Sequence, residues 1–313
     1  MTAATRDADQ GAKPEWLRRK ERGNVFWIRL MSWLSLLFGR RLSRIVLHGI
    51  ALYFVLAAPK ARQASSDYLT RVLGRPARRS DVYRHILAFA STIHDRVYLL
   101  NDRYDLFDTA IEGAEQLHRV NATRKGCLLF GAHLGSFEIL RSVARDDGGL
   151  KVSAAMYPDN ARLLNDALTA INPGVMLDVI ELGHLESMLR VHQRLQEGAM
   201  VGILADRASG PDQYITVSFL GAPARFPSGP FRMAAMLRQP VFFMSGLYRG
   251  GNRYEIQFEL LEEFAARPSG RREDAVHALL EKYVAALERY CRAAPYNWFN
   301  FYDFWNPVDR ETH

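Results

Sequence analysis

A histidine and a glutamate five residues apart are the strongest candidates for chemistry in this chain. His133 and Glu138 lie in the segment GAHLGSFE, directly after the apolar run 127–132. That run has the length and composition of a buried strand, and α/β sheets place functional groups at the carboxyl ends of their strands. A chain that turns after His133 can bring the Glu138 carboxylate to the imidazole. A carboxylate on one ring nitrogen fixes the tautomer and stabilises the imidazolium, so this pair could act as a general base on a hydroxyl.

The sequence lacks the motifs of the common alternative chemistries. It contains no G-x-x-x-x-G-K-[ST] phosphate loop, no G-x-S-x-G nucleophile elbow and no H-E-x-x-H zinc motif. Its two cysteines, Cys127 and Cys291, are too few for a disulfide framework or a cysteine-rich metal site. Cys127 lies inside the apolar run, where we expect a buried small side chain and not a nucleophile. No metal site is predicted.

The elements that would position the histidine follow from the alternation of patterns after residue 126. Short apolar runs of strand length occur at 127–132, 150–156, 175–181 and 199–205, and helical patterns fill the intervals at 136–146, 159–171 and 184–197. This alternation predicts parallel βαβ units. A Gly/Pro-rich loop is expected over 206–229, a hairpin over 240–260 and a helix over 272–293, whereas 63–120 is expected to be helical. The predicted fold class is α/β, with a mostly parallel central sheet, flanking helices and N-terminal membrane-associating helices.

The basic charge of the chain is concentrated near its amino end. The whole chain has a formal net charge of +7, whereas residues 1–80 hold 16 Lys or Arg and 5 Asp or Glu. The same region contains two apolar runs, 25–38 and 45–58. As a helix each run would span about 21 Å, less than a hydrocarbon core of about 30 Å. Apolar faces with basic flanks and tryptophans favour a helix pair at an anionic membrane surface. The alternative is a pair of core helices with solvated ends.

These patterns suggest two parts and restrict the partners. We predict a membrane-associating segment over 1–62 and an α/β domain over 63–313. Nucleic acid is not favoured as a partner, because the basic residues alternate with bulky aliphatic ones. The tail 296–305 is aromatic at seven of its ten positions, which fits packing on the core or contact with lipid.

The motif and two later blocks resemble a known family. GAHLGSFE is similar to the H-x4-[DE] motif of the lysophospholipid-type acyltransferases, and most similar to that of the bacterial lipid A biosynthesis lauroyl/myristoyl acyltransferases. The blocks VGILADR (201–207) and VSFLGAPARFPSGPFRMAA (217–235) also resemble blocks of that family, so the resemblance extends over most of the chain. Departures occur at Ser136 and Phe137, where Asn and Trp are common, and at Arg207, where Gln is more usual.

The resemblance implies a specific reaction. A fatty acyl group would pass from an acyl carrier protein or acyl-CoA thioester to a hydroxyl of a membrane lipid, without a cofactor and without a covalent acyl-enzyme. His133 would be the base and Glu138 its acidic partner. The enzyme would work at the cytoplasmic face of the bacterial inner membrane, as a monotopic protein or with a single N-terminal anchor. The departures leave the acceptor open among lipid A, other glycolipids and polyene lipids.

Further residues are candidates for binding substrate or stabilising an oxyanion. Backbone N–H groups at Gly135 and Ser136 could serve as oxyanion donors. Asp206 and Arg207 end a predicted strand and so are expected at the same sheet edge as His133, with Asp206 a possible second carboxylate partner. A Gly-rich loop that opens a helix could hold a phosphate; its residues are Arg225, Ser228, Gly229 and Arg232.

The sequence leaves open two other functions, and the role of one pair of arginines. The same base acting on water would give a thioesterase or lipid hydrolase, and a fold kept without turnover would give a lipid-binding protein. Arg141 and Arg145 suit either a docking site for an acidic carrier protein or the solvated face of a helix.

Overall fold

A seven-stranded sheet forms the centre of the protein. The computed structural model describes residues 21–122, 125–140, 142–143, 151–175, 177–207, 213–264 and 271–305. The strands have the order β1-β9-β8-β2-β5-β3-β4, and every neighbouring pair is parallel except β8–β9. Their bounds are β1 Asp108–Glu112, β2 Cys127–Gly131, β3 Val152–Met156, β4 Asp178–Glu181, β5 Met200–Leu204, β8 Val241–Tyr248 and β9 Arg253–Glu262. The predicted α/β class with a mostly parallel sheet is confirmed.

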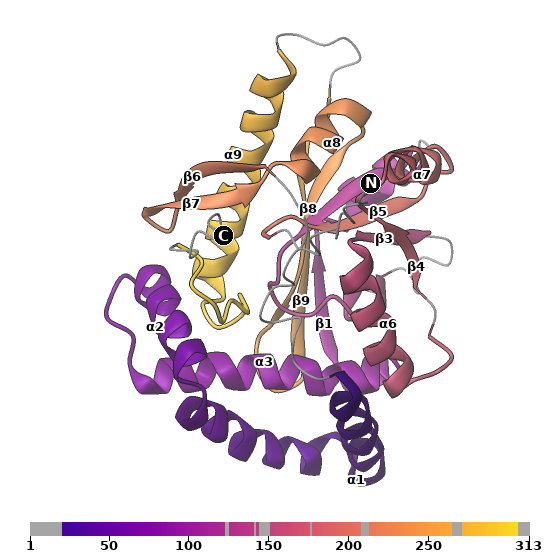
Figure 1. Cartoon of the computed structure of the whole chain (residues 1–313). Coiled ribbons are helices and arrows are strands. Elements are labelled where there is room, and N and C mark those ends of the chain that lie inside the picture. Colours follow the sequence, from indigo (N-terminus) through magenta and orange to yellow (C-terminus); the bar gives the residue numbers. More distant parts are fainter. Residues whose placement is uncertain are drawn as a thin grey trace, which may run out of the picture.

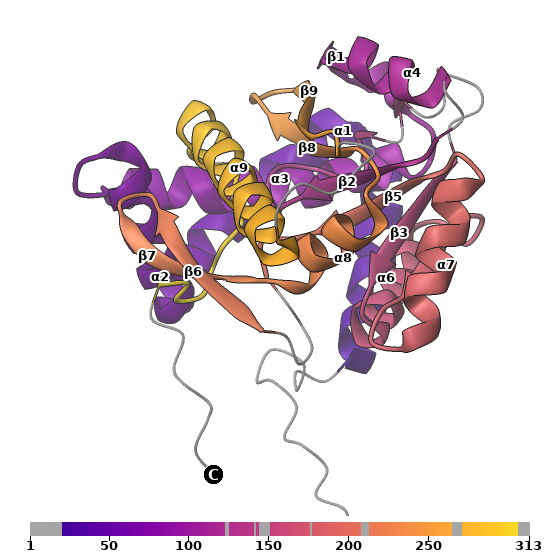
Figure 2. The same ribbon diagram turned by 90° about the horizontal axis from the view of Figure 1, so that it is seen from above.

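Helices cover both faces of this sheet (Figures 1 and 2). On one face, Phe130 of β2 and Phe243 of β8 pack against Tyr283 in the long helix α9. The opposite face carries Leu129, Met200 and Met244. The helices that follow β1 in the chain are α4 Ala114–Ala122, α6 Pro158–Ile171, α7 Leu185–Gln196, α8 Gly229–Leu237 and α9 Arg272–Ala293. β2 is buried at all five positions, as expected of a central strand with neighbours on both sides.

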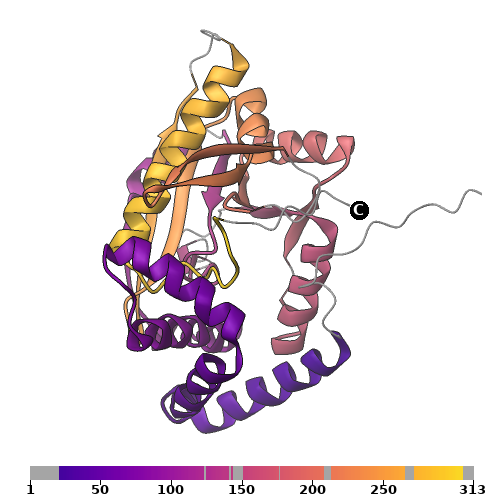
Figure 3. The same cartoon turned by 60° about the vertical axis from the view of Figure 1, so that its left-hand side comes forward.

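In the described residues, three α-helices precede the first strand, and the first of them is bent. α1 covers Glu21–Ala57, α2 covers Pro59–Leu73 and α3 covers Arg79–Leu99. Gly39 interrupts α1 with φ 75° and ψ 163°, a conformation that glycine adopts without a steric penalty, and Figure 3 shows the resulting bend. α1 packs mainly against α3 and also contacts α6, and it lies at the outside of the molecule (Figure 1). The predicted boundary at residue 62 falls inside α2.

α1 exposes a long row of apolar side chains. It includes Trp33, Leu36, Leu37, Phe38, Leu42, Ile45, Val46, Leu52, Tyr53, Phe54 and Leu56. Within the described residues, no single helix is both long and apolar enough to cross a bilayer, although the pair Ile28–Ala57 and Pro59–Leu73, bent by 97°, meets the length and composition criteria together. So many exposed apolar side chains on one helix are unusual on a soluble monomer and are typical of a surface that contacts a partner or a membrane.

Two sequence predictions require correction. The region 63–120, expected to be helical, also contains the short helix η2 Tyr104–Leu106 and the edge strand β1. β1 is exposed along its whole length and therefore lacks the apolar pattern of a strand. The expected loop 206–229 contains a hairpin of β6 Tyr214–Phe219 and β7 Ala222–Pro227. Its turn uses Leu220 and Gly221, both with positive φ. The alternation of polar and apolar residues along β6 is the sequence pattern that could have predicted the first of these strands.

Candidate active site

His133 lies at the carboxyl edge of the sheet, where two parallel strands end side by side. β2 ends at Gly131 and β5 at Leu204, and these two residues are paired in register. The residues that follow, His133 and Asp206, are therefore brought together. The His133 Nδ1 atom lies 2.9 Å from Asp206 Oδ1, and the His133 backbone N–H donates to Oδ2 at 3.1 Å. Asp206 is the carboxylate that orients the imidazole.

Asp206 is itself held by two further groups. The indole N–H of Trp298 donates to Oδ2 at 3.1 Å, and Arg207 Nε lies 3.8 Å from the same oxygen. The carboxylate is fully buried. Burial alone would raise the pKa of Asp206, but the electrostatic attraction of the His133 ring in its protonated form, the charge of Arg207 and the hydrogen bonds from His133 lower it well below its usual range. Asp206 is therefore ionised and cannot act as an acid at neutral pH.

The electrostatic surroundings keep His133 neutral. Its side chain is 37% exposed, and it lines a large cavity. Burial lowers the pKa of His133 most and Arg207 lowers it further, whereas Asp206 opposes both; the net effect is a pKa below that of a free histidine. With Nδ1–H donating to Asp206, Nε2 carries the free lone pair. A neutral imidazole with one nitrogen committed to a carboxylate has the properties required of a general base.

Glu138 has other partners than the ones expected from sequence. Arg96 of α3 places its Nε 2.6 Å from Glu138 Oε1, and the Ser136 hydroxyl donates to Oε2 at 3.1 Å. The predicted hydrogen bond between Glu138 and His133 does not occur among the described contacts, because Asp206 occupies Nδ1. Glu138 lies in a turn and not inside a helix. Part of the helix expected over 136–146, residue 141 and residues 144–146, falls outside the described residues, and Arg141 and Arg145 are among these. Glu138 and His133 nevertheless line the same cavity.

The backbone of Gly135 and Ser136 is engaged in holding the fold together. The Gly135 N–H donates to the Asn297 carbonyl at 2.9 Å, and the Ser136 N–H donates to the Gly246 carbonyl at 2.8 Å. A Cβ at Gly135 would lie 2.0 Å from the Gly246 carbonyl oxygen, and its φ is 73°. These two N–H groups are thus committed to protein acceptors, so in this conformation neither is free to bind an oxyanion.

Of the remaining candidate residues, three line the cavity and two, Ser228 and Arg232, do not. Arg207, Arg225 and Gly229 line the cavity. The Arg207 guanidinium lies over the Tyr302 ring at 5.2 Å, and its Nε is buried without a hydrogen-bond acceptor. Ser228 precedes α8 and has a buried hydroxyl with no partner among the described residues. Arg232 instead makes an ion pair with Glu273 of α9 and does not line the cavity.

A single large cavity connects these groups. Its volume is about 2010 Å³, and it extends from α2 and α3 across the carboxyl edge of the sheet to α6. His133, Glu138, Asp206 and Arg207 line one part of it. Most of the remaining wall is apolar, with Leu163, Leu164, Leu168, Leu177, Met188 and Met200 among its members. Such a wall suits an aliphatic chain.

The sequence profile of bacterial lipid A biosynthesis acyltransferases matches residues 12–306. The chain belongs to this acyltransferase family. The sequence has no significant match among curated proteins.

Other chemistries of the acyltransferase site find no support in its side chains. Cys127 and Cys291 are both buried, and burial raises the pKa of each thiol, that of Cys127 to about 12. A protonated, inaccessible thiol is a poor nucleophile. In the described part of the chain, no three His, Cys, Asp or Glu side chains are grouped to hold a metal ion.

Sequence reasoning did not identify three residues that position this acyltransferase site. Arg96 holds Glu138, Trp298 holds Asp206, and the Asn297 carbonyl accepts from Gly135. The Phe299 N–H also donates to the His133 carbonyl at 2.7 Å. The many aromatic residues of the tail 296–305 indicated that this segment packs on the core or on lipid, but its place against the loop that carries His133 follows only from the fold.

Proposed function

We propose that this acyltransferase moves a fatty acyl group from an acyl carrier protein or acyl-CoA thioester to a hydroxyl of a membrane lipid or glycolipid. The observation that carries the proposal is the placement of His133. Its imidazole is oriented by a buried carboxylate and faces an apolar cavity of about 2010 Å³, large enough for acyl chains. Membership of the family supports the acyl donor and the lipid acceptor in general terms.

The reaction uses His133 as base and then as acid. Nε2 takes the proton of the acceptor hydroxyl as its oxygen attacks the thioester carbonyl, and a tetrahedral intermediate with an oxyanion forms. When the carbon–sulfur bond breaks, the imidazolium returns its proton to the leaving thiolate. Asp206 stabilises the imidazolium between these steps, and the acyl group never attaches to the protein.

Two charged groups at the cavity complete the proposed machinery. Arg207 has a buried Nε without an acceptor and is the strongest candidate to stabilise the oxyanion, because the backbone groups of Gly135 and Ser136 are engaged. Glu138 provides a second negative charge in the cavity wall, and we assign it the role of stabilising the imidazolium or the acceptor hydroxyl. Arg225 and the start of α8 at Gly229 are assigned to the phosphate of the donor or the acceptor.

The membrane is the proposed location of the reaction. The exposed apolar row of α1 is the surface assigned to the lipid interface, at the cytoplasmic face of the inner membrane. The protein would be monotopic or carry one N-terminal anchor. In this arrangement a thioester donor on the same face of the membrane would meet the lipid acceptor at the cavity.

The experiment that tests the function compares donors and products directly. Detergent-purified protein is incubated with acyl carrier protein and CoA thioesters in the presence of bacterial lipid, and products are identified by mass spectrometry. A new acylated lipid that is absent with His133→Ala would support acyl transfer and would reveal the acceptor. Release of free fatty acid alone would contradict the proposal and identify a hydrolase. Lipid binding without turnover of any thioester would instead identify a binding protein.

A further inference from the structure

Two adjacent residues of α3 face opposite sides of the protein. Asp95 is fully buried and contacts arginines of α1, whereas Arg96 faces the cavity and pairs with Glu138. One turn of one helix therefore connects the outer layer of the molecule to the catalytic loop. Because α3 is a rigid element and both contacts are charged, displacement of one contact is expected to displace the other.

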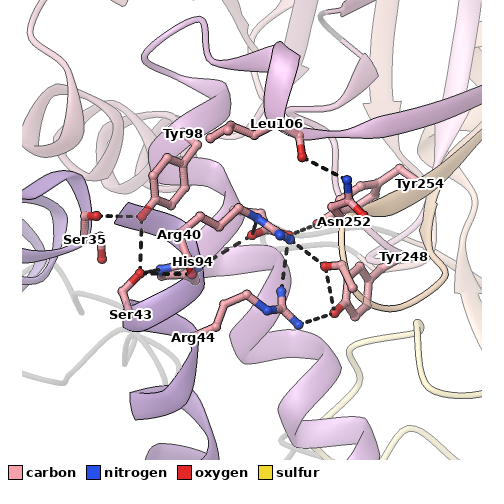
Figure 4. Close-up of polar contacts among 12 residues, drawn as sticks. Ser35, Arg40, Ser43, Arg44, His94, Tyr98, Leu106, Tyr248, Asn252 and Tyr254 are labelled. Atoms are coloured by element: carbon pink, nitrogen blue, oxygen red, sulfur yellow. Dashed lines mark hydrogen bonds and ion pairs between the residues drawn. The ribbon is translucent and has the colours of Figure 1, made fainter. Parts of the chain in front are cut away.

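The contact on the α1 side is a dense polar cluster (Figure 4). Arg40 makes two parallel hydrogen bonds to the Asp95 carboxylate, each 2.8 Å long, directly after the break at Gly39. The Tyr254 hydroxyl of β9 donates to the same carboxylate at 2.8 Å. Arg40 also donates to the Gly251 carbonyl in the β8–β9 turn at 2.6 Å. This pair of parallel hydrogen bonds requires the planar guanidinium of an arginine, because the ammonium group of a lysine cannot form both.

A second series of hydrogen bonds begins at Arg44, four residues after Arg40 in α1. Arg44 donates to the Tyr248 hydroxyl at the end of β8 at 2.7 Å, as Figure 4 shows. The Tyr248 backbone then forms two hydrogen bonds with the Asn297 side chain, of 2.7 and 3.0 Å. The Asn297 carbonyl accepts from Gly135, which lies between His133 and Glu138. The two routes thus reach the catalytic loop at Glu138 and at Gly135.

We propose that Arg40 and Arg44 are positioning residues that hold the His133–Glu138 loop in its productive geometry through Asp95–Arg96 and through Tyr248–Asn297. This inference rests on the proposed function of that loop. It gives the polar side of α1 a role in catalysis, separate from the apolar row that is assigned to the membrane. The location of a side chain to within about 1 Å can alter a rate by about 100-fold, so small shifts are sufficient.

The test uses two mild variants and a matched control. Arg40→Lys keeps the charge but loses the paired hydrogen bonds, and Tyr248→Phe removes only the hydroxyl that accepts from Arg44. Arg41→Lys is the control, because Arg41 is adjacent in sequence but exposed. Each protein is studied in full length with lauroyl and myristoyl thioesters of CoA and acyl carrier protein. Three properties are measured: kcat and KM, the melting temperature, and the NMR signal of the His133 ring, assigned with His133→Ala.

We expect kcat to fall about 10- to 100-fold in both variants with KM for the donor changed less than about twofold, and the His133 signal to shift. Arg41→Lys should behave as wild type in all three measurements. A purely structural role would lower the melting temperature while kcat per folded enzyme and the His133 signal stay unchanged, and that result would overturn the proposal. If the wild-type protein turns over no thioester, the proposed function fails, and the His133 signal alone then decides the positioning role.

Discussion

Asp206 holds His133 at two points, through its ring and through its backbone. One carboxylate oxygen lies 2.9 Å from Nδ1, and the other accepts the His133 backbone N–H at 3.1 Å. The second contact fixes the loop and the first fixes the ring, so a single buried side chain sets both the position and the tautomer of the proposed base. The geometry arises because β2 and β5 are parallel neighbours whose ends are in register.

Replacing this carboxylate should remove most of the activity. Asp206→Asn retains the size of the side chain but no longer stabilises the imidazolium, so kcat should fall about 100- to 10,000-fold. Glu138→Gln provides the comparison: it should lower kcat less, because Asp206 and not Glu138 contacts the ring. Steady-state kinetics on proteins with matched melting temperatures measure both. A larger loss in Glu138→Gln would assign the imidazole to Glu138.

The pH dependence of kcat/KM should report the pKa of His133. The base is active when neutral, and burial and Arg207 lower the pKa of His133, so activity should rise with pH through a midpoint below that of a free histidine and stay constant above it. Arg207→Gln removes a positive charge and should move the midpoint to higher pH. A pH–rate profile of both proteins with one soluble thioester measures this shift. An unchanged midpoint would show that Arg207 does not act on His133.

The sequence predicted the scaffold better than the contacts within the site. The alternation of strand and helix patterns predicted the parallel sheet. It also predicted that His133 and Asp206 lie at one edge, because parallel strands end on the same side of a sheet. The sequence named two carboxylates for His133, with Glu138 as the main partner and Asp206 as a possible second one, and the contact to the ring is made by Asp206. Glu138 is nearer in the chain, yet the register of β2 with β5 brings Asp206, 73 residues away, to the ring.

The missed residues have a common physical cause. Arg96 and Trp298 act across long separations in sequence, and each comes from a segment whose pattern indicates only a helix or an aromatic tail. The hairpin β6–β7 was missed for a different reason. Its glycines and prolines suggested a loop, whereas the turn at Leu220 and Gly221 uses positive φ values to join two strands.

A buried histidine outside the active site should make stability depend on pH. His85 is fully buried between Ser65 and the Trp298 carbonyl, and burial lowers the pKa of His85 to about 4. The unfolded chain takes up a proton near pH 6.5, so the free energy of unfolding should decrease as the pH falls from 6.5 toward 4. The decrease attributable to His85 is about 3 kcal/mol.

Chemical denaturation at several pH values measures that slope. His85→Gln cannot titrate, so its free energy of unfolding should lose this part of the pH dependence even if the variant is less stable at every pH. A slope equal to that of the wild type would show that other groups cause the acid sensitivity.

The apolar row of α1 should govern binding to membranes. Leu37→Glu and Ile45→Glu each place a charge on this row and should weaken the binding to vesicles of anionic phospholipid, measured by co-sedimentation, about 10-fold or more. Leu189→Glu on α7 is the matched control. Leu189 is an exposed leucine like Leu37, but it belongs to a different helix, far along the chain from α1. Equal losses in all three variants would argue against α1 as the membrane surface.

The most direct test of the central claim is chemical rescue of His133. The ring is 37% exposed to the cavity, so a small base can enter the space left by His133→Ala. We predict that His133→Ala loses acyl transfer to the lipid acceptor and that added imidazole restores part of the rate, in proportion to its unprotonated fraction. Full activity of His133→Ala without imidazole would contradict the assignment of His133 as the base.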